Sequence, residues 1–452
     1  MSSKKHYVSF AESVLRIKYP NFDPKNQSPE EKGLYICAFI EQVSYDNLAE
    51  VEKYLEYLNL DEVHSKGYSV LQYCKSVAMT RLLLENGANL FFINKNDGLP
   101  IEHSYSVYIF KYLLMKMREV DPNSVADLND CLDRTGMSFF HTMIAFRTHK
   151  VVEWLIEDEC HAKELGFSTP NLFEYADDDD LDTMQTAIMT QSSEKIISAI
   201  YPKIPKNHNY DDLTWLMLCI INKCYDGVTF FGKNLKDIEQ YYGPYSVTAL
   251  MFAATMVDIE SCKLLLNLGA DPNKKCGKNI HSVASSVLLA DKLKFSVNEK
   301  LTLLELLKER GANFRETFDD GNILLSLSIE EEPEIFEFFA SQADPSSFSF
   351  KSKEGLQLIH LACKKNKNLK NIMILFKYAP KETLDVNTFS AFEFEKMTPL
   401  AFAARNGDRD TCLFLLNSGA NPDIKCGAGY KASHFAKSAG HNKLADELKG
   451  RE

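Results

Sequence analysis

One segment near the end of the chain constrains the fold more than any other. Residues 397–427 read MTPLAFAARNGDRDTCLFLLNSGANPDIKCG. Thr398 and Pro399 predict a helix start, because a threonine side chain can accept hydrogen bonds from free amides and proline loses no bond at the first helical position. Gly407 ends this helix, and a second helix follows up to Gly419. The second helix carries an apolar stripe formed by Cys412, Leu415 and Leu416.

The same two-helix pattern returns elsewhere in the chain. Residues 247–273 repeat the paired alanines, the cysteine and the closing glycine at the same offsets, and residues 67–91 keep the second helix after a shortened turn. Segment 397–427 resembles an ankyrin repeat, whose consensus contains T-P-L-H-x-A-A, a glycine, a leucine-rich helix and G-A-D-x-N. Ala401 stands where that consensus has histidine.

This resemblance implies an all-α fold. We expect an α-solenoid of about eleven to twelve stacked ankyrin-like helix-turn-helix repeats, from a period of ~33 residues applied to 33–452, with irregular insertions and terminal caps. One such insertion lies near Asp291 to Asn298. The predicted segments are 1–32, an N-terminal cap and link; 33–159, degenerate repeats; 160–242, divergent repeats or an insertion; 243–427, ankyrin repeats; and 428–452, a capping repeat.

Composition excludes several classes of protein. The chain of 452 residues has a formal net charge of −12, which argues against a general nucleic-acid binder. Its 11 cysteines form no C-x-x-C pair, which favours free thiols in a reducing compartment. Charged residues interrupt the N-terminal 20 residues, which argues against a cleaved signal peptide. No stretch of eighteen uncharged apolar residues occurs, which argues against a transmembrane helix. We therefore expect a monomer without a transmembrane segment, either cytoplasmic or secreted without a cleaved signal peptide.

Several residue groups could carry chemistry, and for each a structural role is favoured. Four histidines are assigned to the consensus histidine position, where a ring nitrogen bonds neighbouring backbone: His141, His281, His360 and His434. Cys262, Cys363 and Cys412 are expected to be buried. Cys276 and Cys426 occupy the same position in the hairpins of their repeats. For these two thiols the alternative to a structural role is partial exposure and oxidation. The aspartate run 177–180 with Asp182 predicts a helix-capping turn rather than a calcium site, since it lacks the glycine and terminal glutamate of an EF-hand.

Charge is segregated late in the chain. Every charged residue from Glu316 to Asp344 is acidic, whereas the stretch from Lys351 to Lys381 has lysines against a single Glu354. Complementary faces between neighbouring repeats are the favoured interpretation, and a bipolar docking surface is the alternative.

The resemblance implies a scaffold that binds a protein partner through its inner helices and hairpin tips. Adjacent Phe91 and Phe92 cannot both point inward from an extended strip, so one is a candidate anchor. The full set of candidate partner-binding residues is Phe91, Phe92, Asn94, Lys275, Arg405 and Lys425.

Two further hypotheses concern what such a scaffold does. Irregular repeats and frequent Lys, Asn, Ile and Phe resemble ankyrin-repeat effectors that intracellular bacteria deliver into host cells, where the partner is a host protein; an internal scaffold without a host role is the other possibility. The alternative from a different class is an enzyme, such as a Cys–His thiol hydrolase, within 160–242. Phosphate loops and the G-x-S-x-G motif are missing from the sequence, so we assign no catalytic residue, cofactor or metal.

Overall fold

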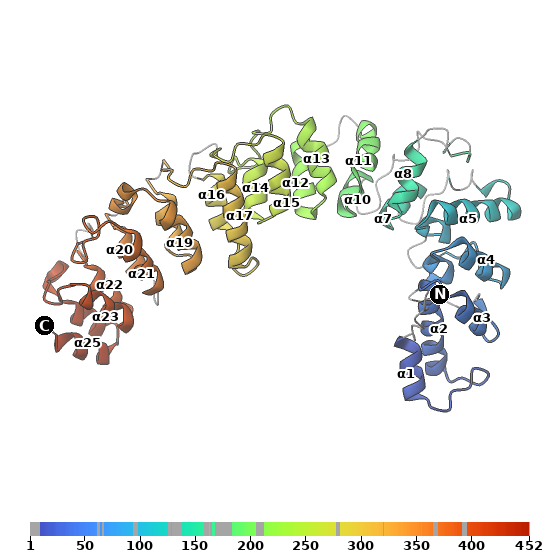
Figure 1. The fold of residues 1–452 in the computed structure, drawn as a ribbon, viewed down its shortest axis with the longest axis horizontal. Helices are drawn as coiled ribbons and strands as arrows, with labels where there is room; N and C mark the ends of the chain where they lie inside the picture. The colour runs from blue at the N-terminus through green and yellow to red at the C-terminus, as the bar shows by residue number, and fades with distance from the viewer. Residues whose placement is uncertain are drawn as a thin grey trace, which may run out of the picture. The chain divides into compact units, whose positions relative to one another are not determined.

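The computed structural model describes residues 10–451 except 61–63, 66, 94–97, 125–127, 129–137, 158–161, 163–164, 168–182, 205–211, 277–280, 320, 354, 365–368 and 391–395. The chain divides into two compact units (Figure 1): residues 1–211, called the N-terminal unit, and residues 212–452, called the C-terminal unit. This division falls inside the segment 160–242 that the sequence sets apart.

The N-terminal unit begins with a helix that covers the first helix pair. Its elements are α1 (Phe10–Lys18), α2 (Pro29–Ser44), α3 (Leu48–Leu55), the paired strands β1 (His64–Ser65) and β2 (Tyr68–Ser69), the 3₁₀ turn η2 (Val70–Tyr73), α4 (Val77–Glu85), the 3₁₀ turn η3 (Pro100–His103), α5 (Val107–Val120), α7 (Phe139–Ala145), α8 (His149–Glu157), α10 (Thr183–Met189), α11 (Glu194–Ile200) and η5 (Tyr201–Lys203).

The C-terminal unit is built of helix pairs along its described length. Its elements are α12 (Asp212–Asn222), α13 (Tyr225–Asn234), α14 (Ala249–Thr255), α15 (Ile259–Asn267), α16 (Val283–Leu289), α17 (Val297–Glu309), α18 (Leu324–Ser328), α19 (Pro333–Gln342), η6 (Pro345–Ser349), α20 (Leu358–Lys364), α21 (Leu369–Tyr378), α22 (Pro399–Arg405), α23 (Arg409–Asn417), η7 (Gly427–Gly429), α24 (Ala432–Ser438) and α25 (Asn442–Lys449).

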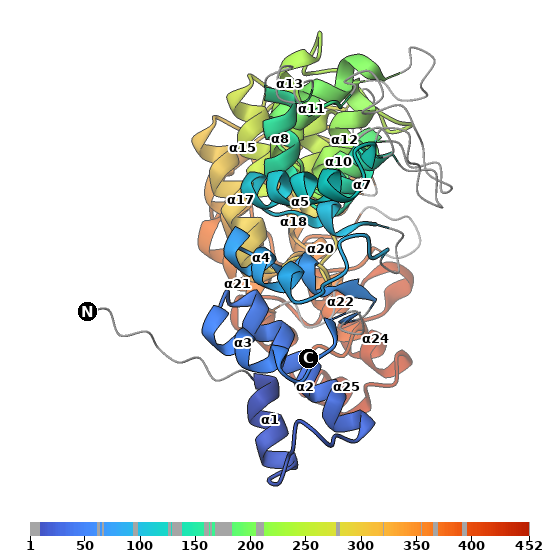
Figure 2. The ribbon, with the colours of Figure 1, turned by 90° about the vertical axis from the view of Figure 1, so that its right-hand side faces the viewer.

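Within each unit the pairs stack in two rows. In the C-terminal unit, α12, α14, α16 and α18 contact in sequence as first helices, and α13 through α23 contact in sequence as second helices (Figures 1 and 2). In the N-terminal unit the first row is α2, η2, η3, α7 and α10, and the second row is α3, α4, α5, α8 and α11. The described residues thus form five pairs in the N-terminal unit, two of them with a 3₁₀ turn as the first element, and seven pairs in the C-terminal unit.

Helix starts in both units follow the predicted capping chemistry. Thr398 Oγ1 accepts a hydrogen bond from the Ala401 amide at 3.3 Å, with Pro399 in the first turn of α22. Gly407 has a φ of 72°, a left-handed conformation that glycine adopts at little cost, and it turns the chain into α23. Ser28 caps α2 in the same way, as part of a reciprocal capping box with Glu31. The reading of 397–427 as two helices joined at Gly407 is confirmed.

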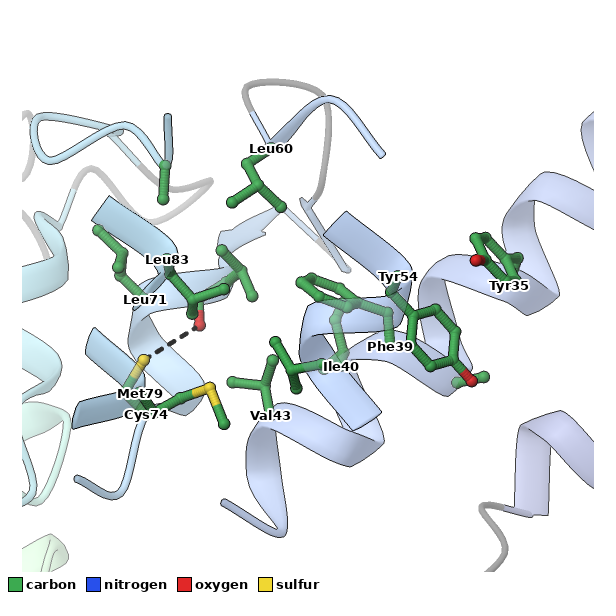
Figure 3. Close-up of a cluster of buried hydrophobic side chains, with 14 of the residues drawn as sticks. Tyr35, Phe39, Ile40, Val43, Tyr54, Leu60, Leu71, Cys74, Met79 and Leu83 are labelled. Atoms are coloured by element: carbon green, nitrogen blue, oxygen red, sulfur yellow. Dashed lines mark hydrogen bonds between the residues drawn. The ribbon is translucent and has the colours of Figure 1, made fainter. Parts of the chain in front are cut away.

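The core of the first repeats lies between the two rows of helices (Figure 3). Phe39, Val43 and Val51 are fully buried, and the Tyr54 ring lies 4.7 Å from the Tyr35 ring and 5.8 Å from the Phe39 ring. Farther along, the Cys74 thiol lies 4.0 Å from the Val70 carbonyl oxygen. Apolar side chains of successive pairs therefore merge into one continuous core.

Two of the expected first helices are single 3₁₀ turns. The repeat pattern predicts two helices per repeat within 33–159, but η2 and η3, which stand in the place of first helices, contain four residues apiece. The backbone becomes extended at Cys74 and Ser104. Two residues later, the side chains of Ser76 and Ser106 cap α4 and α5, so the second helix begins early. Serine capping thus overrides the helical pattern.

One histidine assignment is wrong. Ser282 caps α16 and the helix begins at Val283, so the consensus histidine position is occupied by Ser285, four residues after His281. His141, His360 and His434 do lie three residues after their helix caps.

The divergent middle continues as helix pairs in its described residues. Helices α10 and α11 contact each other, as do α12 and α13. Farther on, the predicted insertion forms a loop after Ala290 and the first turn of α17, and it leaves Leu293 99% exposed. The aspartate run 177–182 lies outside the described residues.

Candidate functional site

Short hairpins precede four helix pairs of the C-terminal unit. Antiparallel bridges join Tyr242 to Val247 before α14 and Lys275 to Ser282 before α16. Two more precede α18 and α20, at Thr317 with Ile323 and at Lys351 with Gln357. These hairpins occupy equivalent places in successive repeats, so they form one edge of the unit, which we call the hairpin edge.

Asparagine side chains link the connections between neighbouring repeats. Asn273 Nδ2 donates to the Gly311 carbonyl oxygen at 3.0 Å, and Asn273 Oδ1 accepts from the Asn313 amide. Asn387 makes the equivalent pair of bonds to Gly419 and Asn421, at 3.1 and 2.8 Å. Because each asparagine satisfies backbone groups of the next repeat, these connections hold a defined spacing.

The most exposed aromatic residues of the hairpin edge are three tyrosines. Tyr241 is 42% exposed, Tyr242 37% and Tyr245 70%. The Tyr241 hydroxyl donates to the Lys275 carbonyl oxygen at 3.0 Å, and Lys274 Nζ lies 5.5 Å from the centre of the Tyr241 ring. Sequence reasoning missed this cluster, although the motif YYGPY at 241–245 combines a turn with three aromatics and could have revealed it.

Lys275, one of the predicted contact residues, bonds within the protein. Its Nζ donates to the Thr317 carbonyl oxygen at 3.0 Å, lies 3.8 Å from the Glu316 carboxylate, and stands 5.6 Å from the centre of the Phe318 ring. Burial raises the pKa of Glu316, while hydrogen bonding by Ser282 and the charge of Lys275 oppose that shift. Lys275 therefore joins two hairpins.

The other predicted contact residues fall into two groups, one in each unit. In the N-terminal unit Phe91 is 37% exposed and Phe92 is half-buried, while Asn94 lies outside the described residues. In the C-terminal unit the half-buried Arg405 lies over the Phe402 ring at 5.3 Å, and Lys425 is exposed. Within the C-terminal unit, Arg405 and Lys425 lie in a different repeat from Lys275.

The histidines are used in packing. His141 is fully buried, and its Nε2 lies 2.7 Å from Thr186 Oγ1 of the next pair. His360 Nδ1 accepts from the Gln357 amide at 3.1 Å, and its Nε2 lies 3.1 Å from the Thr388 carbonyl oxygen. Across the described residues, no group of three or more His, Cys, Asp or Glu side chains could hold a metal ion.

The structure corrects one alternative for the hairpin cysteines. Cys276 and Cys426 are only 3% and 5% exposed, so the alternative of partly exposed, oxidisable thiols is wrong. The Cys426 amide donates to the Tyr430 carbonyl oxygen at 2.8 Å, and its thiol lies against Thr398. The other cysteines behave as predicted: Cys262, Cys363 and Cys412 are buried, and burial raises the pKa of each thiol.

The thiols of the described middle region do not fit a nucleophile. Cys219 and Cys224 are 0% and 1% exposed, and their side chains hydrogen-bond to each other. Burial raises the pKa of Cys219 far above its ordinary value, whereas the hydrogen bond with Cys219 lowers the pKa of Cys224, whose thiol is nevertheless buried without access. A reactive cysteine needs access and a lowered pKa, so this pair packs as core.

Comparison with known proteins adds the family. A model of three ankyrin repeats matches residues 295–426, and a single ankyrin-repeat model matches residues 246–276; both matches lie in the C-terminal unit. No curated protein matched the chain. No helix within the described ranges is long and apolar enough to cross a membrane. Residues 246–426 of this protein are therefore ankyrin repeats.

Proposed function

We propose that this protein is a scaffold that binds a protein partner through the hairpin edge of its C-terminal unit. Ankyrin repeats are in general protein-interaction modules with extended binding surfaces. The observation that carries the proposal is the cluster of Tyr241, Tyr242 and Tyr245, which stands exposed directly before the first matched repeat.

The tyrosine cluster has the properties of a binding surface. Tyrosine offers a large contact area with few rotatable bonds, so little conformational entropy is lost on binding. The hydrogen bond from Tyr241 to Lys275 ties the cluster to the neighbouring hairpin, and Lys275 itself is tied to Thr317. The edge is therefore organised before a partner arrives, which lowers the cost of association.

We also propose that the N-terminal unit consists of diverged ankyrin-like repeats. The support is its two-row stacking, which follows the same order of contacts as the matched C-terminal repeats. Phe91 and Phe92 would then belong to a connection of that unit, and Arg405 and Lys425 would extend the surface of the other. The effector role stays a prediction, because the family matches identify repeats and no effector family.

Paired tyrosine substitutions test the proposed surface. Tyr245→Ser removes a ring that is 70% exposed, and the matched control Tyr108→Ser removes one that is 78% exposed on α5 of the N-terminal unit. Proteins captured from a lysate by the wild type are identified, and their affinities for each variant are measured. Because aromatic anchors dominate interface energy, Tyr242→Ser with Tyr245→Ser should weaken binding at least tenfold. Equal losses in the control, or none in the double variant, would reject the hairpin edge.

A further inference from the structure

A second candidate site lies in the N-terminal unit, in a cavity of about 480 Å³ beside the 3₁₀ turns η2 and η3. Lys75 and Tyr105 belong to the extended connections that replace the missing ends of the first helices. The space that a full first helix would fill is thus left open. The residues that line the cavity are Ser44, Tyr68, Gln72, Tyr73, Lys75, His103, Tyr105, Ala145, Phe146 and Arg147.

Gln72 in the wall of this cavity has no hydrogen-bond partner. The residue is 5% exposed, and both its Oε1 and its Nε2 are buried without a partner in the described structure. A buried amide without partners costs free energy, because it has lost its hydrogen bonds to water. The side chain offers one acceptor and a donor pair, which match the donor and acceptor of a peptide bond.

Aromatic rings form the apolar part of the wall. The His103 and Phe146 rings stack with centroids 3.7 Å apart, and the Tyr68 ring meets His103 edge-on at 5.7 Å. Tyr105 is 55% exposed at the opening. Burial lowers the pKa of His103 to about 4, so this ring is neutral at pH 7 and belongs to the apolar surface.

Two cations give the cavity a positive charge. Lys75 and Arg147 are both exposed, and neither forms an ion pair with a carboxylate in the described part of the chain. None of the described residues that line the cavity is acidic. Because the whole chain carries a net charge of −12, this local reversal of sign selects for an anionic ligand.

The placement of the cations favours a chain over a compact anion. Lys75 follows η2 and Arg147 follows α7, which is two steps along the first row. Helices pack 8–10 Å apart, so equivalent backbone positions are separated by roughly 16–20 Å. An extended peptide advances ~3.3 Å per residue, so acidic residues roughly four to six positions apart could reach both cations.

We propose that this cavity binds an acidic peptide segment of a partner protein. An apolar or aromatic side chain of the segment lies against His103 and Phe146, a backbone amide pairs with Gln72, and flanking carboxylates meet Lys75 and Arg147. This inference rests on the proposed function in one respect, because both take a protein as the binding partner. The cavity and the hairpin edge are different surfaces, so each can be tested by itself.

Selection from a bead-bound library of random octapeptides by the full-length protein tests the site. The wild type should enrich sequences with two acidic residues around an apolar one. Enrichment should disappear with Lys75→Glu plus Arg147→Glu and persist in the charge-matched control Lys150→Glu plus Lys236→Glu, whose exposed lysines do not line the cavity.

Gln72→Leu separates recognition from simple attraction between charges. Leucine leaves no buried polar atom unpaired, so the variant should fold, as checked by circular dichroism, and yet bind the selected peptides at least fivefold more weakly. Unchanged affinity in this variant, or enrichment without acidic residues, would overturn the proposal. Binding of labelled ADP in place of any peptide would overturn it too and assign a nucleotide instead. The double variant at Tyr242 and Tyr245 should keep the selection, so failure of the two proposals can be told apart.

Discussion

Among the described residues, neighbouring repeats of the N-terminal unit are joined mainly by neutral and cation–π contacts, with one ion pair between Lys195 and Glu157, whereas those of the C-terminal unit are joined by several ion pairs as well as by neutral contacts. In the first, His141 bonds Thr186, and the rings of Phe139 and Phe167 stack at 5.6 Å. In the second, Glu331 holds Lys292 at 2.8 Å and Lys300 at 3.6 Å, and Arg409 bonds Glu447 through two nitrogens. The same stacking geometry is thus stabilised in two ways.

Left-handed turns within the pairs occur in both units. Asp46, Arg147 and Gln191 adopt this conformation in the N-terminal unit, with φ of 58°, 60° and 60°, whereas the C-terminal unit uses Lys223 and Val257, with φ of 56° and 49°, as well as Gly407 and Gly440. A non-glycine residue pays about 1–2 kcal/mol for this conformation. Stacked amphipathic helices tolerate that cost, so the fold does not need the consensus glycine. The matched repeats contain both kinds of turn, with Val257 in the match at 246–276 and Gly407 in the match at 295–426.

The largest expected effect concerns the buried charges. Lys300 and Glu331 have side chains only 2% and 6% exposed, and Lys300 Nζ also donates to the Ala290 carbonyl oxygen. Glu331→Gln should destabilise the C-terminal unit by about 3–5 kcal/mol, because it leaves Lys300 buried without its counter-charge. The measurement is urea unfolding followed by Trp215 fluorescence in a Trp154→Phe background, since the chain has one tryptophan in each unit.

Adding Lys300→Met should recover part of this loss, because the unpaired charge is then gone. The exposed Glu334→Gln is the control and should change stability by within about 0.5 kcal/mol. If Glu331→Gln behaves like that control, the buried charges do not hold the repeats together.

The next effect is the pH dependence of the stability of the N-terminal unit, in which His103 packs as a neutral ring. The folded-state pKa of His103 is about 4, below its unfolded value of about 6.5, so protonation favours the unfolded chain. Its contribution is complete above pH 6.5 and is lost as the pH falls toward 4. Between pH 7 and 4 the wild type should lose about 3 kcal/mol more than His103→Phe. Trp154 fluorescence in a Trp215→Phe background reports this unit, and parallel pH profiles would show that His103 is not the source.

A smaller effect distinguishes the glycine turns. A Cβ at Gly407 would lie 2.5–2.7 Å from atoms of the His441 ring, whereas one at Gly440 meets nothing within 4 Å. Gly440→Ala should cost about 1–2 kcal/mol for its left-handed conformation, and Gly407→Ala should cost about 1 kcal/mol more. Thermal unfolding compares them. Adding His441→Ala to Gly407→Ala should reduce its loss of stability to that of Gly440→Ala. If the loss stays larger, contact with the His441 ring is not its cause.

The smallest effect is a gain in stability. Gln191→Gly should stabilise the N-terminal unit by about 0.5–1 kcal/mol relative to Gln191→Ala, because both variants lose the side chain and only one relieves the left-handed strain. Chemical unfolding read at Trp154 measures the difference. A gain of zero would mean that this turn is not strained.

The sequence alone predicted a repeat and its helix ends where the residues that set them act on their own stretch of backbone. The threonine cap, the proline in the first turn and Gly407 predict the helix pair at 397–427, because each acts on its own backbone. The same reasoning failed at His281 and at η2 and η3. At these places the side chain of a serine caps the helix and sets its first residue. The spacing of apolar residues does not predict which serine acts as the cap.

Tertiary structure alone decided what each side chain meets. The burial of Cys276, the use of Lys275 as a link and the empty partner positions of Gln72 depend on the neighbouring repeat, which no single repeat sequence encodes. Consensus positions specify packing within a pair and leave the surface free to vary. The sequence by itself therefore determined the kind of fold, while the stacking of repeats created the hairpin edge and the cavity at Gln72.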